Sequence, residues 1–287
     1  MWRVVVGMGF LAGAVAQGAT PVDVVLLGGQ SNMVGGLTHK SQLPAALQQP
    51  QGDIPFYDYT NLVYGTPLTT LRPGTGANAH AFGPEITFGR AVADSQAMPL
   101  ALIKCGRGAT DLAVDWDPAT GPAYLDFRNT VATGMQKLRD AGYEPRITGM
   151  LWTQGERDAN RGRTTAQYTA DLNEFITDVR GRYGADLPFF ISRLSDNQLP
   201  SQAAAFNLIR AAQDAVAAAD PHAFLIDTDG DAFSVFADDP IHFDSGGQIA
   251  LGNAFAASYI ANVPEPTALA WVASGSIAAL ARRRRAR

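Results

Sequence analysis

Short apolar runs alternate with longer amphipathic stretches along most of the chain. Runs rich in β-branched and aromatic residues predict strands at 22–28, 99–105, 147–153, 187–193 and 223–228. After the third run, the apolar residues recur with a helical period, at Tyr168, Leu172, Phe175, Ile176, Val179 and Tyr183. Further helices are expected at 84–96, 124–141, 201–219 and 246–261. This alternation predicts an α/β fold, a three-layer α/β/α sandwich around a five-stranded parallel sheet.

Residues 35–82 follow neither the helical nor the strand period and are rich in Pro, Gly, Gln and Tyr. We expect a long loop here, and such loops are usually functional in a compact domain. Its aromatic side chains can either stack on a sugar ring or pack the loop onto the domain, and both readings stay open for Phe56, Tyr57, Tyr59 and Tyr64.

The composition fits one domain with a full hydrophobic core, because 46% of the 287 residues are hydrophobic. Without residues 1–19 and 264–287, the chain keeps 16 basic and 26 acidic side chains, a net charge of −10. Nucleic acid as a partner requires a basic face, so this acidic body argues against it. Because Cys105 is the only cysteine, the chain has no internal disulfide.

The first 19 residues have the composition of a secretory signal peptide. Arg3 precedes the apolar run VVVGMGFLAGAVA, and Ala14 and Ala16 form an A-x-A cleavage site. We expect cleavage after Ala16 or, as a second choice, after Ala19. The catalytic domain is therefore expected at 20–263.

Residues 264–287 join Pro-Glu-Pro, an apolar stretch at 267–281 and a cluster of arginines. The apolar stretch is short for a membrane-spanning helix. The three parts in this order resemble the PEP-CTERM sorting signal of Gram-negative bacteria. The resemblance implies export, transient anchoring in the inner membrane and processing by an exosortase-type enzyme. The mature protein would then reach the cell surface or the extracellular matrix, or be secreted; a plain membrane anchor is the alternative.

Candidate catalytic residues lie where the predicted strands end, which is where α/β folds bind their ligands. The first strand ends in GGQSNM, a tight turn that exposes Ser31. Near the last helix, Asp239 precedes His242 by three residues, so its carboxylate can accept the Nδ1 proton and leave Nε2 as a general base. A serine in a glycine-rich turn is often only a helix cap. The three residues together form a nucleophile, a base and a group that orients the base.

Two further strand ends offer hydrogen-bond donors for an oxyanion. The second strand runs into CGRGATDL, where Gly108 has no Cβ to keep its N–H from a substrate. The third runs into WTQGERDA, where the amide of Gln154 can donate another hydrogen bond. An ordinary turn glycine and an ordinary loop glutamine are equally compatible with these positions.

These blocks, with HAFGPEITFGRAVA at 80–93, resemble those of the SGNH hydrolases, which have a flavodoxin-like fold. The closest branch is the sialate O-acetylesterase-like and acetyl xylan esterase-like carbohydrate esterases. The resemblance implies a triad of Ser31, Asp239 and His242. It also implies an oxyanion hole of the Ser31 and Gly108 N–H groups and the Gln154 side chain, with Glu156 holding the loop. Where the branch usually has a second glycine this chain has Ala109, for which we expect a negative φ.

The expected function is that of a serine esterase that removes O-acetyl groups from acetylated polysaccharide or sialic-acid-like sugars through an acyl-enzyme. No metal or other cofactor is expected, since DTDGD at 227–231 lacks the spacing of an EF-hand loop. A lipase or thioesterase is a second reading, which the absence of a long apolar lid in the sequence disfavours. A catalytically silent surface or matrix protein is a third, disfavoured by the complete triad.

Overall fold

Seven strands form one sheet in the computed structural model, which describes residues 18–60, 66–74 and 78–264. The sheet order is β3-β2-β4-β1-β5-β6-β7, and every neighbouring pair is parallel except β2 with β3. The strands are β1 (Thr20–Gly29), β2 (Gln51–Thr60), β3 (Thr69–Leu71), β4 (Leu100–Gly106), β5 (Tyr143–Thr153), β6 (Phe189–Ser192) and β7 (Ala223–Ile226). Apart from residues 18, 19 and 264, the segments assigned to the signal peptide and the sorting tail lie outside the described residues.

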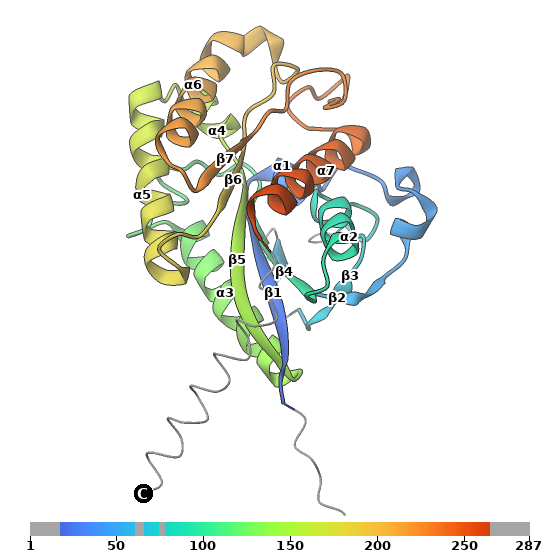
Figure 1. Ribbon diagram of the computed structural model, residues 1–287. Coiled ribbons are helices and arrows are strands. Elements are labelled where there is room, and N and C mark those ends of the chain that lie inside the picture. The colour runs from blue at the N-terminus through green and yellow to red at the C-terminus, as the bar shows by residue number, and fades with distance from the viewer. Residues whose placement is uncertain (1–17, 61–65, 75–77, 265–287) are drawn as a thin grey trace, which may run out of the picture.

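Helices cover both faces of the sheet (Figure 1). One face carries α2 (Glu85–Ser95) and α7 (Ser245–Asn262), and the other carries α3 (Pro122–Asp140), α5 (Thr165–Tyr183) and α6 (Ala203–Ala219). Two hydrophobic cores result, one around Trp116, Trp152 and Phe175 and one around Phe190 and Tyr259. Two short helices, α1 (Ser31–Val34) and α4 (Glu156–Asn160), directly follow the turns after β1 and β5. The three-layer α/β/α sandwich is thus confirmed.

The predicted number of five strands is wrong, because β2 and β3 arise from the segment that we expected to be a loop. Residues 56–60 of β2 pair in parallel with β4, and Gln51, Pro55 and Phe56 pair antiparallel with β3. Gly, Asp and Pro at the start of β2 weaken its strand pattern, and proline is tolerated near a sheet edge. The side chains of Phe56, Tyr57 and Tyr59 are buried, so they pack in the cores, while Tyr64 lies outside the described residues.

The parallel strands bring their carboxyl ends to one edge of the sheet, where the candidate residues of the sequence analysis lie. Ser31 follows β1, Gly108 follows β4, and Gln154 follows β5. Asp239 and His242 lie in the long connection from β7 to α7. In the part of the chain that the structure describes, each helix is either too short or too polar to span a membrane.

Candidate active site

A strained turn at the end of β1 presents Ser31. Gly29 has a φ of +145°, and a Cβ there would lie 2.1 Å from the carbonyl oxygen of Thr153, so only glycine fits between β1 and β5. The Gln30 N–H then donates to the same Thr153 carbonyl at 2.9 Å. Helix α1 runs from Ser31 to Val34 and is capped by Gly35, which takes the left-handed conformation with a φ of +74°. The turn is therefore fixed at both ends, with the serine at the sheet edge.

The structure brings the three predicted triad residues together in one hydrogen-bonded row. Ser31 Oγ lies 2.9 Å from His242 Nε2, and His242 Nδ1 lies 2.8 Å from Asp239 Oδ2. A carboxylate that accepts the Nδ1 proton fixes the tautomer in which Nε2 accepts from the serine hydroxyl. The loop is itself bonded locally, since the His242 N–H donates to the Asp239 carbonyl at 3.1 Å. This geometry is that of an activated serine nucleophile.

A cavity of about 260 Å³ opens beside this row. Its lining combines polar groups with a mostly apolar wall and consists of Ser31, Asn32, Val34, Gly35, Gly36, Leu37, Gly108, His242, Phe243 and Gln248. Gly108 thus lies at the same cavity as the nucleophile, as an oxyanion donor must.

The expected negative φ of Ala109 is wrong, because this residue has a φ of +58°. The turn after β4 is held on both sides. The Arg107 N–H donates to the Gly29 carbonyl at 3.0 Å, and the Thr110 hydroxyl donates to the Arg107 carbonyl at 2.7 Å. Trp116 Nε1 donates to the Thr110 hydroxyl from the core. The chain reverses within this turn, so position 109 takes a left-handed conformation that glycine would adopt without strain.

Gln154 lies behind the cavity, fully buried. Its Nε2 donates to the Thr110 carbonyl at 3.2 Å, to Gln30 Oε1 at 3.3 Å and to Asp158 Oδ2 at 2.5 Å. Its Oε1 accepts from the Tyr168 hydroxyl at 3.0 Å. The amide therefore joins the nucleophile turn to the turn that carries Gly108. Its role as a direct oxyanion donor stays a prediction.

Two carboxylates support the site from the α4 side. Burial raises the pKa of Asp158 to about 6, although hydrogen bonds from Gln154 and from the Leu112 N–H act in the opposite direction. Glu156 Oε1 accepts from Asn32 Nδ2 at 2.6 Å and from Gln198 Nε2 at 3.2 Å. Glu156 thus holds neighbouring loops. Neither Asn32 nor Gln198 was predicted from the sequence, although Asn32 stands directly after Ser31.

A fully buried ion pair under α1 was also not predicted from the sequence. Lys104 Nζ lies 2.6 Å from Glu85 Oε2 and donates to the Val34 carbonyl, the last residue of α1, at 3.1 Å. Glu85 Oε1 accepts from the Gly83 N–H at 2.9 Å. A lysine inside the otherwise apolar strand LALIKC was the available indication, because a buried lysine needs an acidic partner.

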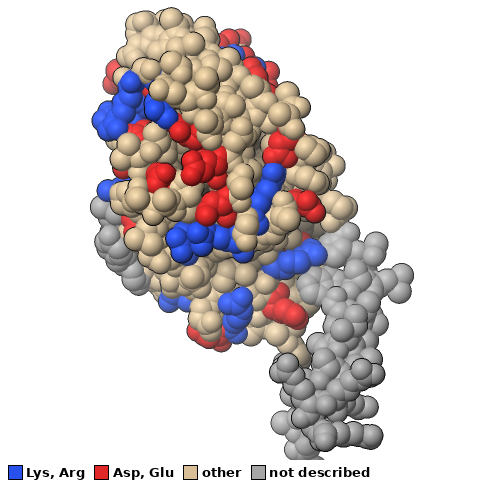
Figure 2. All heavy atoms as spheres, turned by 90° about the vertical axis from the view of Figure 1, so that its left-hand side faces the viewer, with Lys and Arg blue, Asp and Glu red and all other residues tan. Residues whose placement is uncertain are grey.

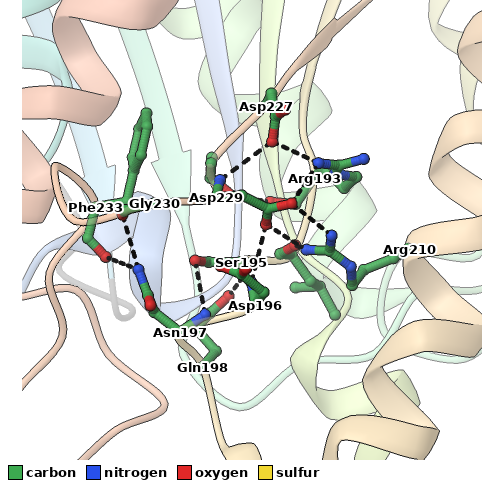
Figure 3. Close-up of polar contacts among 12 residues, drawn as sticks. Arg193, Ser195, Asp196, Asn197, Gln198, Arg210, Asp227, Asp229, Gly230 and Phe233 are labelled. Carbon is green, nitrogen blue, oxygen red and sulfur yellow. Dashed lines mark hydrogen bonds and ion pairs between the residues drawn. The ribbon is translucent and has the colours of Figure 1, made fainter.

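The acidic segment 227–231 binds arginines (Figure 3). Both carboxylate oxygens of Asp229 accept from Arg210, and Arg193 contacts Asp227 and Asp229. These arginines lower the pKa of Asp229 to about 2, chiefly through the hydrogen bond from Arg210. Asn197 Nδ2 donates to the carbonyls of residues 230 and 233. The loop after β6 is thereby tied to the loop after β7. Within the described ranges, no group of His, Cys, Asp and Glu is arranged to hold a metal.

Comparisons with known proteins bear on this fold and site. Residues 21–261 match the family described as carbohydrate esterase, sialic acid-specific acetylesterase. No curated protein sequence matches the chain. A solved structure from Arabidopsis thaliana has a TM-score of 0.67 at 18% identity, covering 84% of this chain and 99% of that one.

Two further solved structures are similar to the chain. A carbohydrate acetylesterase from Xanthomonas citri has a TM-score of 0.58 at 18% identity, over 83% of this chain and 56% of its own. NanS has a TM-score of 0.61 at 14% identity, over 85% and 98%. At such identities the likeness shows a shared fold alone. The family match covers most of the chain, including every residue of the row from Ser31 to Asp239. The chain belongs to the sialic acid-specific acetylesterase family of carbohydrate esterases and is a carboxylic ester hydrolase.

Proposed function

We propose that this hydrolase removes O-acetyl groups from carbohydrates, either acetylated polysaccharide or sialic-acid-like sugars. The observation that carries the proposal is the row of hydrogen bonds from Ser31 through His242 to Asp239, at 2.9 and 2.8 Å. The family match to acetylesterases supports the same chemistry.

In the proposed mechanism, Ser31 Oγ attacks the acetyl carbonyl while His242 Nε2 takes the hydroxyl proton. The carbonyl oxygen becomes an oxyanion, which the N–H groups of Ser31 and Gly108 stabilise. The C–O bond to the sugar then breaks, and the imidazolium gives its proton to the leaving sugar alkoxide. Water, deprotonated by His242, hydrolyses the acetyl-enzyme, which releases acetate and restores Ser31. Asp239 stays ionised and stabilises the imidazolium throughout.

The cavity supports a short acyl group. Among the described residues that line the cavity of about 260 Å³, Val34, Leu37 and Phe243 supply the sizeable apolar side chains, and these offer few contacts to a fatty acyl chain. A lipase or thioesterase is therefore the weaker alternative. A silent matrix protein would leave the hydrogen-bonded triad and the adjacent cavity without a use.

The decisive experiment measures hydrolysis of p-nitrophenyl acetate, of longer acyl esters and of acetylated sugars. It compares the wild-type domain, residues 20–263, with its Ser31→Ala variant. We expect rapid hydrolysis of acetyl esters, a decline with chain length and loss of activity in Ser31→Ala with an unchanged melting temperature. A fluorophosphonate should label Ser31, and His242→Ala should abolish that labelling. Activity of Ser31→Ala near the wild-type level would refute the mechanism.

We further propose that the chain is exported from a Gram-negative cell and anchored transiently by its tail before release. The support is the pattern of the sequence alone, with a signal peptide at 1–19 and a three-part tail at 264–287. In this proposal an exosortase-type enzyme processes the tail, and the enzyme acts at the cell surface, in the matrix or in the medium.

A further inference from the structure

The side chain of Asn32 bonds to the main chain on both sides of the catalytic histidine. Its Oδ1 accepts from the Phe243 N–H at 3.0 Å, and its Nδ2 donates to the Ile241 carbonyl at 3.0 Å. The primary amide thereby pairs with the segment 241–243 as a neighbouring β-strand would. Since Asn32 follows Ser31 directly, these two bonds join the nucleophile turn to the backbone of His242.

A buried network fixes the orientation of this amide. Nδ2 also donates to Glu156 Oε1 at 2.6 Å, and Gln198 Nε2 donates both to the same carboxylate oxygen and to the Ile241 carbonyl, the latter at 2.7 Å. If the amide were flipped, its oxygen would face a carbonyl and a carboxylate, and its NH₂ would face an N–H group. The side chains of Asn32, Glu156 and Gln198 are each at most 1% exposed, so water does not compensate for a lost bond.

Gln198 is itself held in place by the loop after β6. Its Oε1 accepts from the Ser195 N–H at 2.9 Å, and the neighbouring Asn197 bonds to the loop after β7 (Figure 3). Segments that follow β1, β5 and β6 therefore converge on residues 241–243. On its solvent side, the loop that carries Asp239 and His242 makes fewer contacts, because the side chain of Asp239 is 41% exposed.

We infer that Asn32 is a positioning residue that keeps His242 Nε2 within hydrogen-bond distance of Ser31 Oγ, and that Glu156 acts through Asn32. This inference rests on the proposed serine-esterase function. The Nε2–Oγ distance must be short when His242 takes the proton from Ser31 and when it returns a proton to Ser31. A displacement of about 1 Å at such a contact lowers the rate by on the order of 100-fold. Asn32 thus contributes to turnover rather than to substrate affinity.

The test compares Asn32→Ala, Glu156→Ala, Glu156→Gln and the double variant Asn32→Ala/Glu156→Ala on p-nitrophenyl acetate. We expect Asn32→Ala to lower kcat by roughly 100-fold with KM changed less than threefold. Glu156→Ala should lower kcat similarly, and the double variant should lose little more than Asn32→Ala, because the two residues act in series. Glu156→Gln retains an acceptor oxygen and should stay within about fivefold of wild-type kcat.

Tyr259→Phe is the matched control, since it removes one buried hydrogen bond, to Thr148 at 2.7 Å, away from the triad. Its kcat should stay within twofold of wild type. The inference is wrong if Asn32→Ala loses less than threefold in kcat, if the control loses as much, or if only KM changes. Multiplicative losses in the double variant would show that Glu156 acts independently of Asn32.

A second measurement does not depend on esterase activity. The His242 Nδ1 proton, hydrogen-bonded to Asp239, should give a downfield proton resonance that is absent in His242→Ala. We expect it in the wild type and in Tyr259→Phe and expect it broadened or lost in Asn32→Ala. A wild type that shows this resonance but neither hydrolyses acetyl esters nor reacts with a fluorophosphonate would refute the proposed function alone. An unchanged resonance together with unchanged Ser31 labelling in Asn32→Ala would refute the positioning role.

Discussion

Asp158 is the buried group behind the site whose protonation changes near neutral pH. Its carboxylate accepts hydrogen bonds from Gln154 and from the Leu112 N–H while it is shielded from water. Burial has the larger effect and raises the pKa to about 6 from 3.8. The native state therefore holds a proton here over a pH range in which the unfolded chain has lost it.

We predict that this carboxylate makes stability fall as pH rises. Because the native pKa is the higher one, the stabilisation is complete below about pH 4 and is lost as pH rises through about 6, a change of at most about 3 kcal/mol. The free energy of unfolding of the wild type minus that of Asp158→Asn should fall by this amount between pH 4 and 7. Urea denaturation at several pH values measures it. Parallel stability curves for the two proteins would contradict the raised pKa.

At the scale of the element, the end of α1 depends on one glycine. Gly35 has a φ of +74°, and a Cβ there would lie 2.2 Å from the carbonyl oxygen of Phe82. Phe82 is unable to retreat easily, because the Thr38 hydroxyl bonds to both its N–H and its carbonyl, at 2.7 and 2.6 Å. At Gly36, by contrast, the nearest atom to a new Cβ is Val34 Cγ1 at 3.7 Å.

We predict that Gly35→Ala destabilises the protein by about 2 kcal/mol or more, through the left-handed backbone and the contact with Phe82. Gly36→Ala, in the next position, should change the free energy of unfolding by less than about 0.5 kcal/mol. Chemical denaturation of the two variants side by side separates these outcomes. Equal stability of the two would show that α1 does not need its left-handed end.

The elements that the sequence predicted are those with a regular period and full burial. The apolar run of β1 and the stripe of α5 face packed layers, so pattern and structure agree. β2 was missed because Gly52, Asp53 and Pro55 interrupt its pattern, and its place next to β4 depends on contacts distant in sequence. The left-handed Ala109 was missed for a related reason, since neighbouring turns rather than its own preference fix its backbone.

Ser31, Asp239 and His242 were predicted as a triad from a serine in a glycine turn and from an aspartate and a histidine three residues apart, and the structure places them in one hydrogen-bonded row. The network behind them has no comparable pattern. Asn32 and Gln198 are separated by more than 160 positions, and they meet only because the strands that precede them end at the same sheet edge. Residues such as Asn32 and Gln198 can therefore be assigned to the network only from the three-dimensional structure.

For the whole molecule, the distribution of charge argues against a nucleic acid as the substrate. Figure 2 shows acidic and basic side chains interspersed over the face that includes α5, with no broad region of one sign. Ion pairs such as Arg182 with Asp178 neutralise many of these charges locally. Binding of nucleic acid would need a continuous basic surface, and the domain has ten more acidic than basic residues.

The tail at 264–287 follows the last helix of the domain directly. Helix α7 ends at Asn262, the Val263 N–H still bonds to the Tyr259 carbonyl at 2.8 Å, and the proposed processing site begins at Pro264. Cleavage there would leave every described residue of the two cores in place, so we predict that the protein ending near Val263 keeps its melting temperature and its rate of acetyl ester hydrolysis. Intact-mass analysis of the protein from its native host should find an end near residue 263. A mature, surface-exposed enzyme that still carries Arg287 would identify the tail as a plain membrane anchor.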